Sequence, residues 1–76
     1  MDAWEWTAGS WTGITDHEER ALERAAGRLD VGETARVEKA ISSCGALYRL
    51  GVGWTATRAE ADSIDWQPLG SAVVAS

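Results

Sequence analysis

Several residue types that usually reinforce very small proteins are scarce in this 76-residue chain. It has one Cys and one His, so no internal disulfide can form, and a structural zinc site with four Cys or His ligands is not expected. Phe is absent and Pro occurs once. A chain of this length buries only somewhat over ~60% of the surface that its unfolded form exposes. The supplements left to it are large aromatic side chains and self-association.

Long apolar runs and an excess of basic residues are also missing. No run approaches the ~20 residues needed to cross a membrane, and the opening MDAWEW is acidic where a signal peptide is basic. These features predict a cytoplasmic protein with a reduced Cys44 and no membrane contact. Lys and Arg number 7 against 12 Asp and Glu, a net charge of −5. That balance disfavours nucleic-acid binding, which needs basic charge, and favours basic protein partners.

Tryptophan, by contrast, is abundant, with five residues. Trp11 lies in the Gly- and Ser-rich segment 9–13, which is predicted to be a loop, so this ring is expected at the surface. The other four occupy short segments typical of strands and are expected to pack in the core: Trp4, Trp6, Trp54 and Trp66.

A helix is predicted over residues 16–29. The residues TDHE fit a capping box in which Thr15 is the cap and Glu18 reaches back to the cap amide. Apolar residues then recur at helical spacing along one side of the segment, and a Gly follows it.

The remaining chain is typical of strands. A first strand is predicted over 4–8, whereas 32–43 fits either a helix or a strand by its periodicity; we favour a strand. A hairpin is predicted over 46–59, with GVG as its loop. A last edge strand is predicted over 64–69, where Pro68 marks the end.

Together these segments predict an α+β fold. The expected order is strand, helix and three strands, with one helix packed on an antiparallel sheet. Residues 1–76 are expected to form a single domain, with 1–3 and 70–76 as frayed tails.

Three motifs between Trp4 and Leu69 form a pattern: WEWTAGSWTGIT, TARVE and GVGWTATR followed by IDWQPL. This pattern resembles small uncharacterised actinomycete proteins often found beside mobile-element genes. The intervening AISSCGALYRLG is shorter than the linker of that family. The resemblance implies a strand around TARVE and an accessory role on a plasmid, prophage or integrative element. No established activity comes with it.

Candidate catalytic residues are few. His17 lies between Asp16 and Glu18, but neighbouring residues of a helix point in different directions, so these side chains are not expected to share a metal or a proton. Cys44 could be a nucleophile with His17 as its base, yet nothing in their spacing supports that pair. We interpret Cys44 as a small core residue at a turn. No catalytic residue, metal ligand or cofactor is therefore predicted.

Arginines recur every four residues along the predicted helix and form a ridge. This ridge either contacts a partner or is a solvated face, in which Asp16 supports Arg20 at i,i+4 spacing. Exposed Trp is enriched at binding hot spots. We therefore predict a partner-binding surface made of Trp11, Arg20, Arg24 and Arg28.

These observations favour a non-enzymatic protein-interaction module, a regulatory or accessory factor of a mobile element. It would act as a homo-oligomer or on a larger protein partner. Two alternatives remain open. An acidic inhibitor that imitates nucleic acid would need its carboxylates on one surface, and a small enzyme or ligand-binding protein would use Cys44 and His17.

Overall fold

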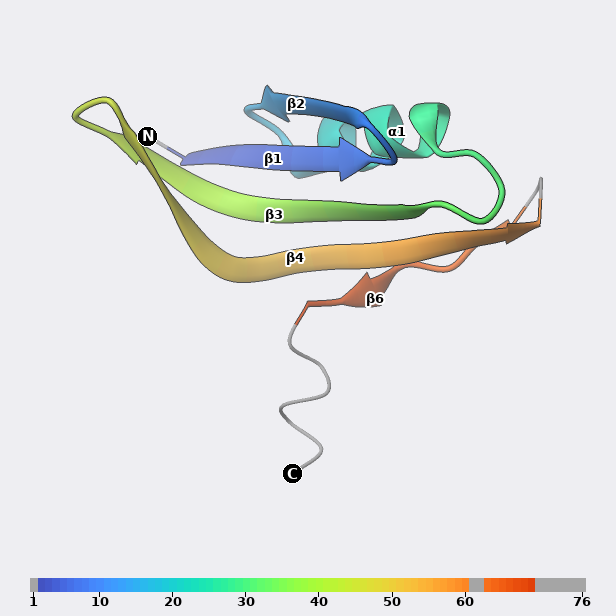
Figure 1. Ribbon diagram of the computed structural model, residues 1–76. Helices are drawn as coiled ribbons and strands as arrows, with labels where there is room; N and C mark the ends of the chain where they lie inside the picture. Colours follow the sequence, from blue (N-terminus) through green and yellow to red (C-terminus); the bar gives the residue numbers. More distant parts are fainter. Residues whose placement is uncertain (1, 61–62, 70–76) are drawn as a thin grey trace.

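The structure is a computed structural model that describes residues 2–60 and 63–69. One helix, α1, spans Glu18–Arg28. The strands are β1 (Asp2–Ala8), β2 (Trp11–Thr15), β3 (Thr34–Ser43), β4 (Ala46–Glu60), β5 (Ser63–Ile64) and β6 (Gln67–Pro68). The prediction of one helix with an antiparallel sheet is confirmed (Figure 1). The predicted order of strand, helix and three strands is wrong, because β2 precedes the helix.

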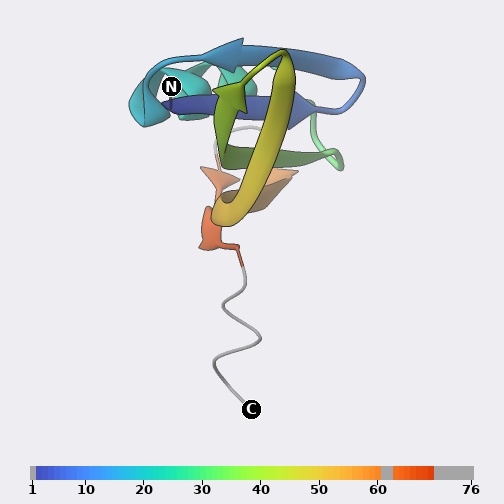
Figure 2. The ribbon, with the colours of Figure 1, turned by 90° about the vertical axis from the view of Figure 1, so that its left-hand side faces the viewer.

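The sheet dominates the molecule. Its strand order is β2-β1-β3-β4-β5, β6 also pairs with β4, and every pairing is antiparallel. The helix packs on one side of this sheet, where it contacts β1, β2 and β3 (Figure 1). The β3–β4 hairpin extends beyond the helix and curls across the end of the sheet (Figure 2). The helix therefore covers only part of one sheet face.

Small side chains bring the helix close to the sheet. Ala21 and Ala25 of α1 are fully buried. Trp6 of β1 belongs to the same core cluster and is only 6% exposed. A buried ring of ~150–250 Å² contributes about 4–6 kcal/mol of transfer free energy. Alternate residues of a strand share a face. Two rows of helix-facing residues run across β1, β3 and β4: Trp6, Val37 and Trp54, and beside them Ala8, Ala35 and Ala56.

The four Trp predicted in the core differ in depth. Trp6 is buried, whereas Trp4 and Trp66 are only partly buried against the core. Trp54 is also partly buried, and its Nε1 donates a hydrogen bond to Glu18 Oε2 at 3.4 Å. The core prediction is thus confirmed for Trp6 and holds in part for the other three.

Residues 9–13 do not form the predicted loop. Gly9 has a φ of 59°, a conformation that glycine adopts without steric cost, and makes the turn between β1 and β2. Every residue of β2 then pairs with β1, from Trp11 opposite Ala8 to Thr15 opposite Trp4. Trp, Thr and Ile in β2 favour a strand, and cross-strand pairing here outweighs the weak strand preference of Gly13. Residues 2 and 3, predicted to fray, also belong to β1 and pair with β3.

The helix is shorter than predicted and lacks the capping box. Because Thr15 is held in β2, His17 occupies the N-cap position, and its side chain makes no capping hydrogen bond. Thr15 Oγ1 instead accepts the His17 N–H at 3.4 Å. The helix ends at Arg28, and Leu29 N–H donates to Ala26 O at 3.4 Å.

The ambiguous segment 32–43 is a strand over most of its length, as favoured. The turn from β3 to β4 consists of Cys44 and Gly45, both with positive φ (51° and 81°), as a type I′ two-residue hairpin turn requires. Cys44 is exposed and free. Its prediction as a turn residue is right, and its prediction as a core residue is wrong, because a side chain at a hairpin tip has nothing to pack under.

The hairpin predicted over 46–59 is wrong as well, since β4 runs through this segment without a turn. The GVG sequence forms a bulge, where the pairing register with β3 shifts after Glu38. Gly51 has a φ of 72°, and its N–H donates to Glu38 Oε2 at 2.9 Å. At Gly53 a Cβ atom would overlap the carbonyl oxygen of Val37. The two glycines bend the strand instead of ending it.

The strand predicted over 64–69 is replaced by β5 and β6, with Pro68 of β6 paired to Trp54 on an outer strand. Residue 1 and residues 70–76, predicted to be frayed, lie outside the described residues. Within 2–60 and 63–69, the structure contains no helix with the length and hydropathy to span a membrane.

Candidate interaction site

A groove lies between the edge strand β2 and the C-terminal half of α1. Its volume is about 470 Å³. The sheet and the helix both contribute to its lining, which consists of Trp6, Trp11, Thr12, Arg24, Gly27 and Arg28. Three of the four residues predicted as the partner-binding surface are therefore together, and we call this site the Trp11 groove.

Trp11 and Arg28 form the best-defined contact in the groove. Trp11 begins β2 on the helix-facing side of the sheet edge, because it pairs with the buried Ala8. The Arg28 guanidinium lies over the Trp11 ring, with Cζ 4.1 Å from the ring centroid. This cation–π contact is worth about 0.5–1 kcal/mol at an exposed site. The contact leaves Trp11 51% exposed, as predicted for this residue.

Glycines create the space of the groove. A Cβ at Gly13 would lie 2.7 Å from the Trp6 indole, so the absence of a side chain lets this ring lie across β2 and form a wall of the site. Gly27 is helical, and a Cβ there would meet nothing within 4 Å. Glycine in a helix costs up to about 1 kcal/mol relative to alanine. The open space above Gly27 is thus kept at a cost in helix stability.

The arginine ridge has a surplus of positive charge. The ion pairs found among the described residues involve Arg36, Lys39, Arg49 and the single His, and none involves Arg20, Arg24 or Arg28. The predicted i,i+4 interaction between Asp16 and Arg20 is absent, because Asp16 precedes the helix. Its Oδ2 lies 3.7 Å from His17 Nε2 instead. Arg24 and Arg28 line the Trp11 groove, whereas Arg20, one turn earlier, does not.

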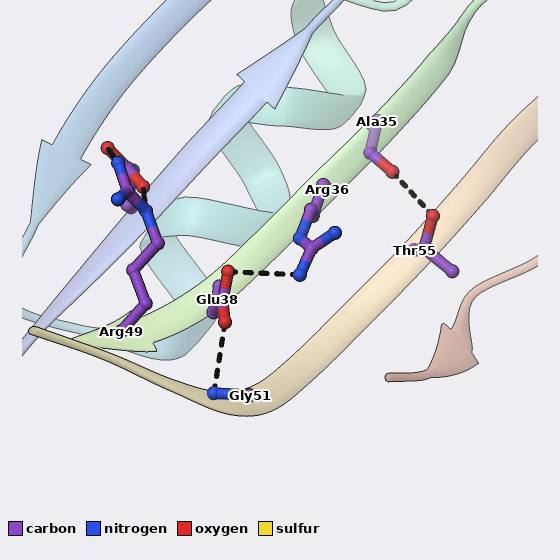
Figure 3. A network of polar contacts seen from close by, with 7 residues as sticks. Ala35, Arg36, Glu38, Arg49, Gly51 and Thr55 are labelled. Atoms are coloured by element: carbon purple, nitrogen blue, oxygen red, sulfur yellow. Dashed lines mark hydrogen bonds and ion pairs between the residues drawn. The ribbon is translucent and has the colours of Figure 1, made fainter. Parts of the chain in front are cut away.

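A second polar cluster lies on the sheet face turned away from the helix, and the sequence analysis missed it (Figure 3). Arg49 donates two hydrogen bonds to Glu5, at 2.7 and 3.1 Å. The Glu5 carboxylate thereby raises the pKa of Arg49 above its ordinary value. Glu38 is only 6% exposed. Its Oε1 lies 3.2 Å from Arg36 Nη2, and its Oε2 accepts the Gly51 N–H. These contacts tie the curled part of β4 to β1 and β3.

The residues weighed for catalysis are not brought together. The His17 imidazole lies near Asp16, its backbone N–H donates to Thr15 and its backbone oxygen accepts the Ala21 N–H. Cys44 accepts a hydrogen bond from the Ser43 hydroxyl at 3.8 Å at the hairpin tip. Within the described part of the chain, no group of three or more His, Cys, Asp and Glu side chains could hold a metal ion. The Trp11 groove is therefore the best-formed candidate site.

Comparison with known proteins identifies no relative: no family model, curated protein or solved structure matches the chain.

Proposed function

We propose that the protein is a non-enzymatic interaction module that binds a segment of a protein partner in the Trp11 groove. The observation that supports this most is the pairing of a half-exposed Trp11 with Arg28, beside Arg24. Trp and Arg are the residue types most enriched at binding hot spots. Their cation–π contact partly orders both side chains before a partner arrives, which lowers the entropy lost on binding.

The chemistry of the groove selects a carboxylate-bearing segment. Arg24 and Arg28 make no ion pair with a described carboxylate, and the guanidinium fork matches a carboxylate with two hydrogen bonds. The ring of Trp11 offers an apolar surface next to them. The net charge of −5 favours basic partners at long range, whereas the two arginines of the groove favour an acidic segment at short range. We therefore expect a short segment with one or two Asp or Glu beside an apolar residue, recognised through the local charge.

Arg20 extends the ridge beyond the groove. It lies on the same helix, one turn before Arg24, and would reach only a partner that continues past the groove. We expect it to contribute less than the two groove arginines. In the setting that the family resemblance implies, the partner would be a protein of a mobile genetic element or of its host.

The two alternatives have less support. An imitation of nucleic acid needs free carboxylates, whereas Asp2, Glu5 and Glu38 lie in ion pairs with cations of the same chain. An enzyme or ligand-binding protein using Cys44 and His17 needs contact between them, and their hydrogen bonds are with residues near each of them in the sequence.

A selection from a random peptide library displayed on phage tests the proposal. We expect enriched peptides to carry Asp or Glu next to an apolar residue. Their affinity should fall at least about tenfold in the double variant Arg24→Gln/Arg28→Gln, since two charge-assisted hydrogen-bond donors are lost. Lys39→Gln, on β3 and outside the groove lining, removes one positive charge as a control and should bind normally. Selection of basic peptides, or equal binding by the double variant, would contradict the proposal.

A further inference from the structure

The sheet ends at β2, which is a regular edge strand. β2 is last in the strand order, and of the described strands only β1 pairs with it (Figure 1). The devices that usually protect such an edge are Lys, Pro, inward-pointing charges and bulges. The sequence WTGIT contains no charged residue and no Pro, and its pairing with β1 runs from Trp11 to Thr15 without a register shift. The outer side of residues 11–15, which we call the β2 edge, can therefore accept another strand.

The backbone of the β2 edge has donors and acceptors that point outward. In an antiparallel sheet, successive residues of a strand direct their N–H and C=O groups to opposite neighbours. The Gly9 N–H donates to a carbonyl oxygen of β3, so Ala8 directs these groups toward β2, where it pairs with Trp11. Trp11 therefore bonds toward β1, and the next residue, Thr12, points its N–H and C=O away from the sheet. The same holds for Ile14, two residues later.

The Trp11 groove opens onto this edge. Trp11 and Gly13 lie on the helix-facing side of β2, since Trp11 pairs with the buried Ala8. The side chain of Thr12 lies on the opposite face of the strand, yet Thr12 belongs to the groove lining. Its backbone, at the outer side of the strand, therefore borders the groove. A segment bound in the groove would lie next to the outward-pointing N–H and C=O groups.

The groove arginines have the spacing that an added strand requires. Residues 16 and 17 join the end of β2 to the start of α1, and Arg28 at the end of α1 lies over Trp11 at the start of β2. The helix and the strand therefore run side by side in opposite directions. Arg24 and Arg28 are about 6 Å apart along the helix axis, and alternate residues of a strand are about 7 Å apart. Two carboxylates on one face of an added strand would thus match the two guanidinium groups.

We propose that the protein segment bound in the Trp11 groove is extended and adds to the β2 edge as a further antiparallel strand. The inference rests on the proposed function and specifies the segment. The residues opposite Trp11 and Gly13 face the helix and are Asp or Glu, which pair with the two groove arginines. The residue between them is apolar and lies on the other face, beside Ile14, which is 57% exposed. Backbone hydrogen bonds supply affinity in this mode of binding, and the alternate side chains supply specificity.

The charge of the site favours a foreign acidic segment over a second copy of this chain. Two β2 edges paired with each other would bring the arginine ridges of both copies to one interface. Arg20, Arg24 and Arg28 make no ion pair with a described carboxylate, so like charges would meet there, which is destabilising. An acidic strand instead supplies the carboxylates that fit the guanidinium fork.

Two synthetic peptides of the same composition test the strand. In Ser-Thr-Glu-Val-Glu-Thr-Ser the glutamates lie on one face of a strand. In Ser-Thr-Glu-Val-Thr-Glu-Ser they lie on opposite faces of a strand but on the same face of a helix. Titration calorimetry with the full chain should show at least about tenfold tighter binding of the first peptide. Equal affinities, tighter binding of the second peptide, or no binding of either up to about 1 mM would overturn the inference.

N-methylation of single peptide residues tests the backbone hydrogen bonds. In the antiparallel strand, the Val of the first peptide lies opposite Thr12 and directs its N–H to β2, whereas the N–H of each Glu points away. A methyl group on the Val nitrogen should therefore raise the Kd at least about tenfold, and one on either Glu nitrogen should change it less than about twofold. Equal losses at Val and Glu would contradict the added strand.

The double variant Arg24→Gln/Arg28→Gln separates this inference from the proposed function. If the double variant loses affinity for the first peptide while N-methylation acts equally at every position, the groove binds acidic segments but not as a strand. If the double variant, with its fold confirmed by circular dichroism, binds as wild type does, the groove proposal itself fails. Amide hydrogen exchange gives a direct readout: saturation with the first peptide should slow exchange of the Thr12 and Ile14 amides at least about tenfold. Unchanged exchange at both amides would overturn the strand.

Discussion

Replacing Gly27 by Ala should make the protein more stable and its groove less able to bind. Gly27 is the penultimate residue of α1, and a methyl group there would meet no atom within 4 Å. Alanine is preferred over glycine in a helix by about 0.8–1.0 kcal/mol in the interior and by less near the end. We therefore expect the free energy of unfolding to rise by about 0.5–1 kcal/mol. At ~4–8 °C per kcal/mol, the thermal midpoint should rise by about 2–8 °C.

The opposite sign is expected for the same substitution at Gly53. There the added Cβ would overlap the Val37 carbonyl oxygen inside the sheet, so Gly53→Ala should lower the free energy of unfolding by more than about 1 kcal/mol. Urea unfolding monitored by Trp fluorescence gives both values. Because the Gly27 methyl group enters the Trp11 groove, that variant should also bind a selected acidic peptide more weakly. A Gly27→Ala chain that unfolds more readily than wild type would refute the reasoning about the open space above Gly27.

Three further predictions follow from burial and charge. Trp6→Ala should lower the free energy of unfolding in urea by about 3–5 kcal/mol, close to complete loss of the fold. Trp66→Ala should lower it less, because Trp66 is only partly buried. Equal losses in the two variants would contradict the core described above. Glu38→Ala should lower the free energy of unfolding by about 1–3 kcal/mol, since the Gly51 N–H would lose its acceptor inside the bulge. An unchanged urea midpoint would show that this hydrogen bond is dispensable. Fluorescence anisotropy should detect no DNA or RNA binding tighter than the non-specific range of about 10⁻⁴–10⁻⁶ M at physiological salt, and nanomolar affinity for a single strand would make the Trp11 groove a nucleic-acid site.

The sequence predicted those parts of the fold in which local pattern and tertiary packing agree. The helix, the first strand and the strand over 34–43 are of this kind, because their apolar faces match the layer that they pack against. Thr15 was misread since TDHE fits a capping box locally, while pairing with Trp4 holds Thr15 in a strand. No local pattern reveals that pairing with a distant strand competes with the helix cap.

The glycines misled the prediction in the C-terminal half. GVG between two apolar segments is typical of a hairpin loop, but here the chain bends within one strand, and a carboxylate from the neighbouring strand accepts the Gly51 N–H. The true turn, Cys44-Gly45, contains a glycine between two strand-like segments. The sequence thus contained a turn signal at 44–45, but the two glycines of GVG at 51–53 gave a stronger one.

Of the residues that line the groove, the sequence analysis singled out Trp11, Arg24 and Arg28, and it did not predict the groove itself. The four-residue spacing places the arginines on one side of the helix, and Trp11 was expected to be exposed. That Arg28 stacks on Trp11 depends on β2, which the sequence analysis did not predict. The pairing of Glu5 with Arg49 likewise joins residues 44 positions apart, and only the curl of β4 brings them together.

The most direct test of the interaction site compares two properties of one variant, Trp11→Ala. Trp11 is half exposed, and its contact with Arg28 is worth little, so the free energy of unfolding in urea should fall by about 1 kcal/mol or less. If Trp11 is the centre of the binding groove, the affinity for a selected acidic peptide should fall by about 2 kcal/mol or more, roughly thirtyfold. A Trp11→Ala chain that unfolds as readily as Trp6→Ala, or that binds the peptide as tightly as wild type, would contradict the account.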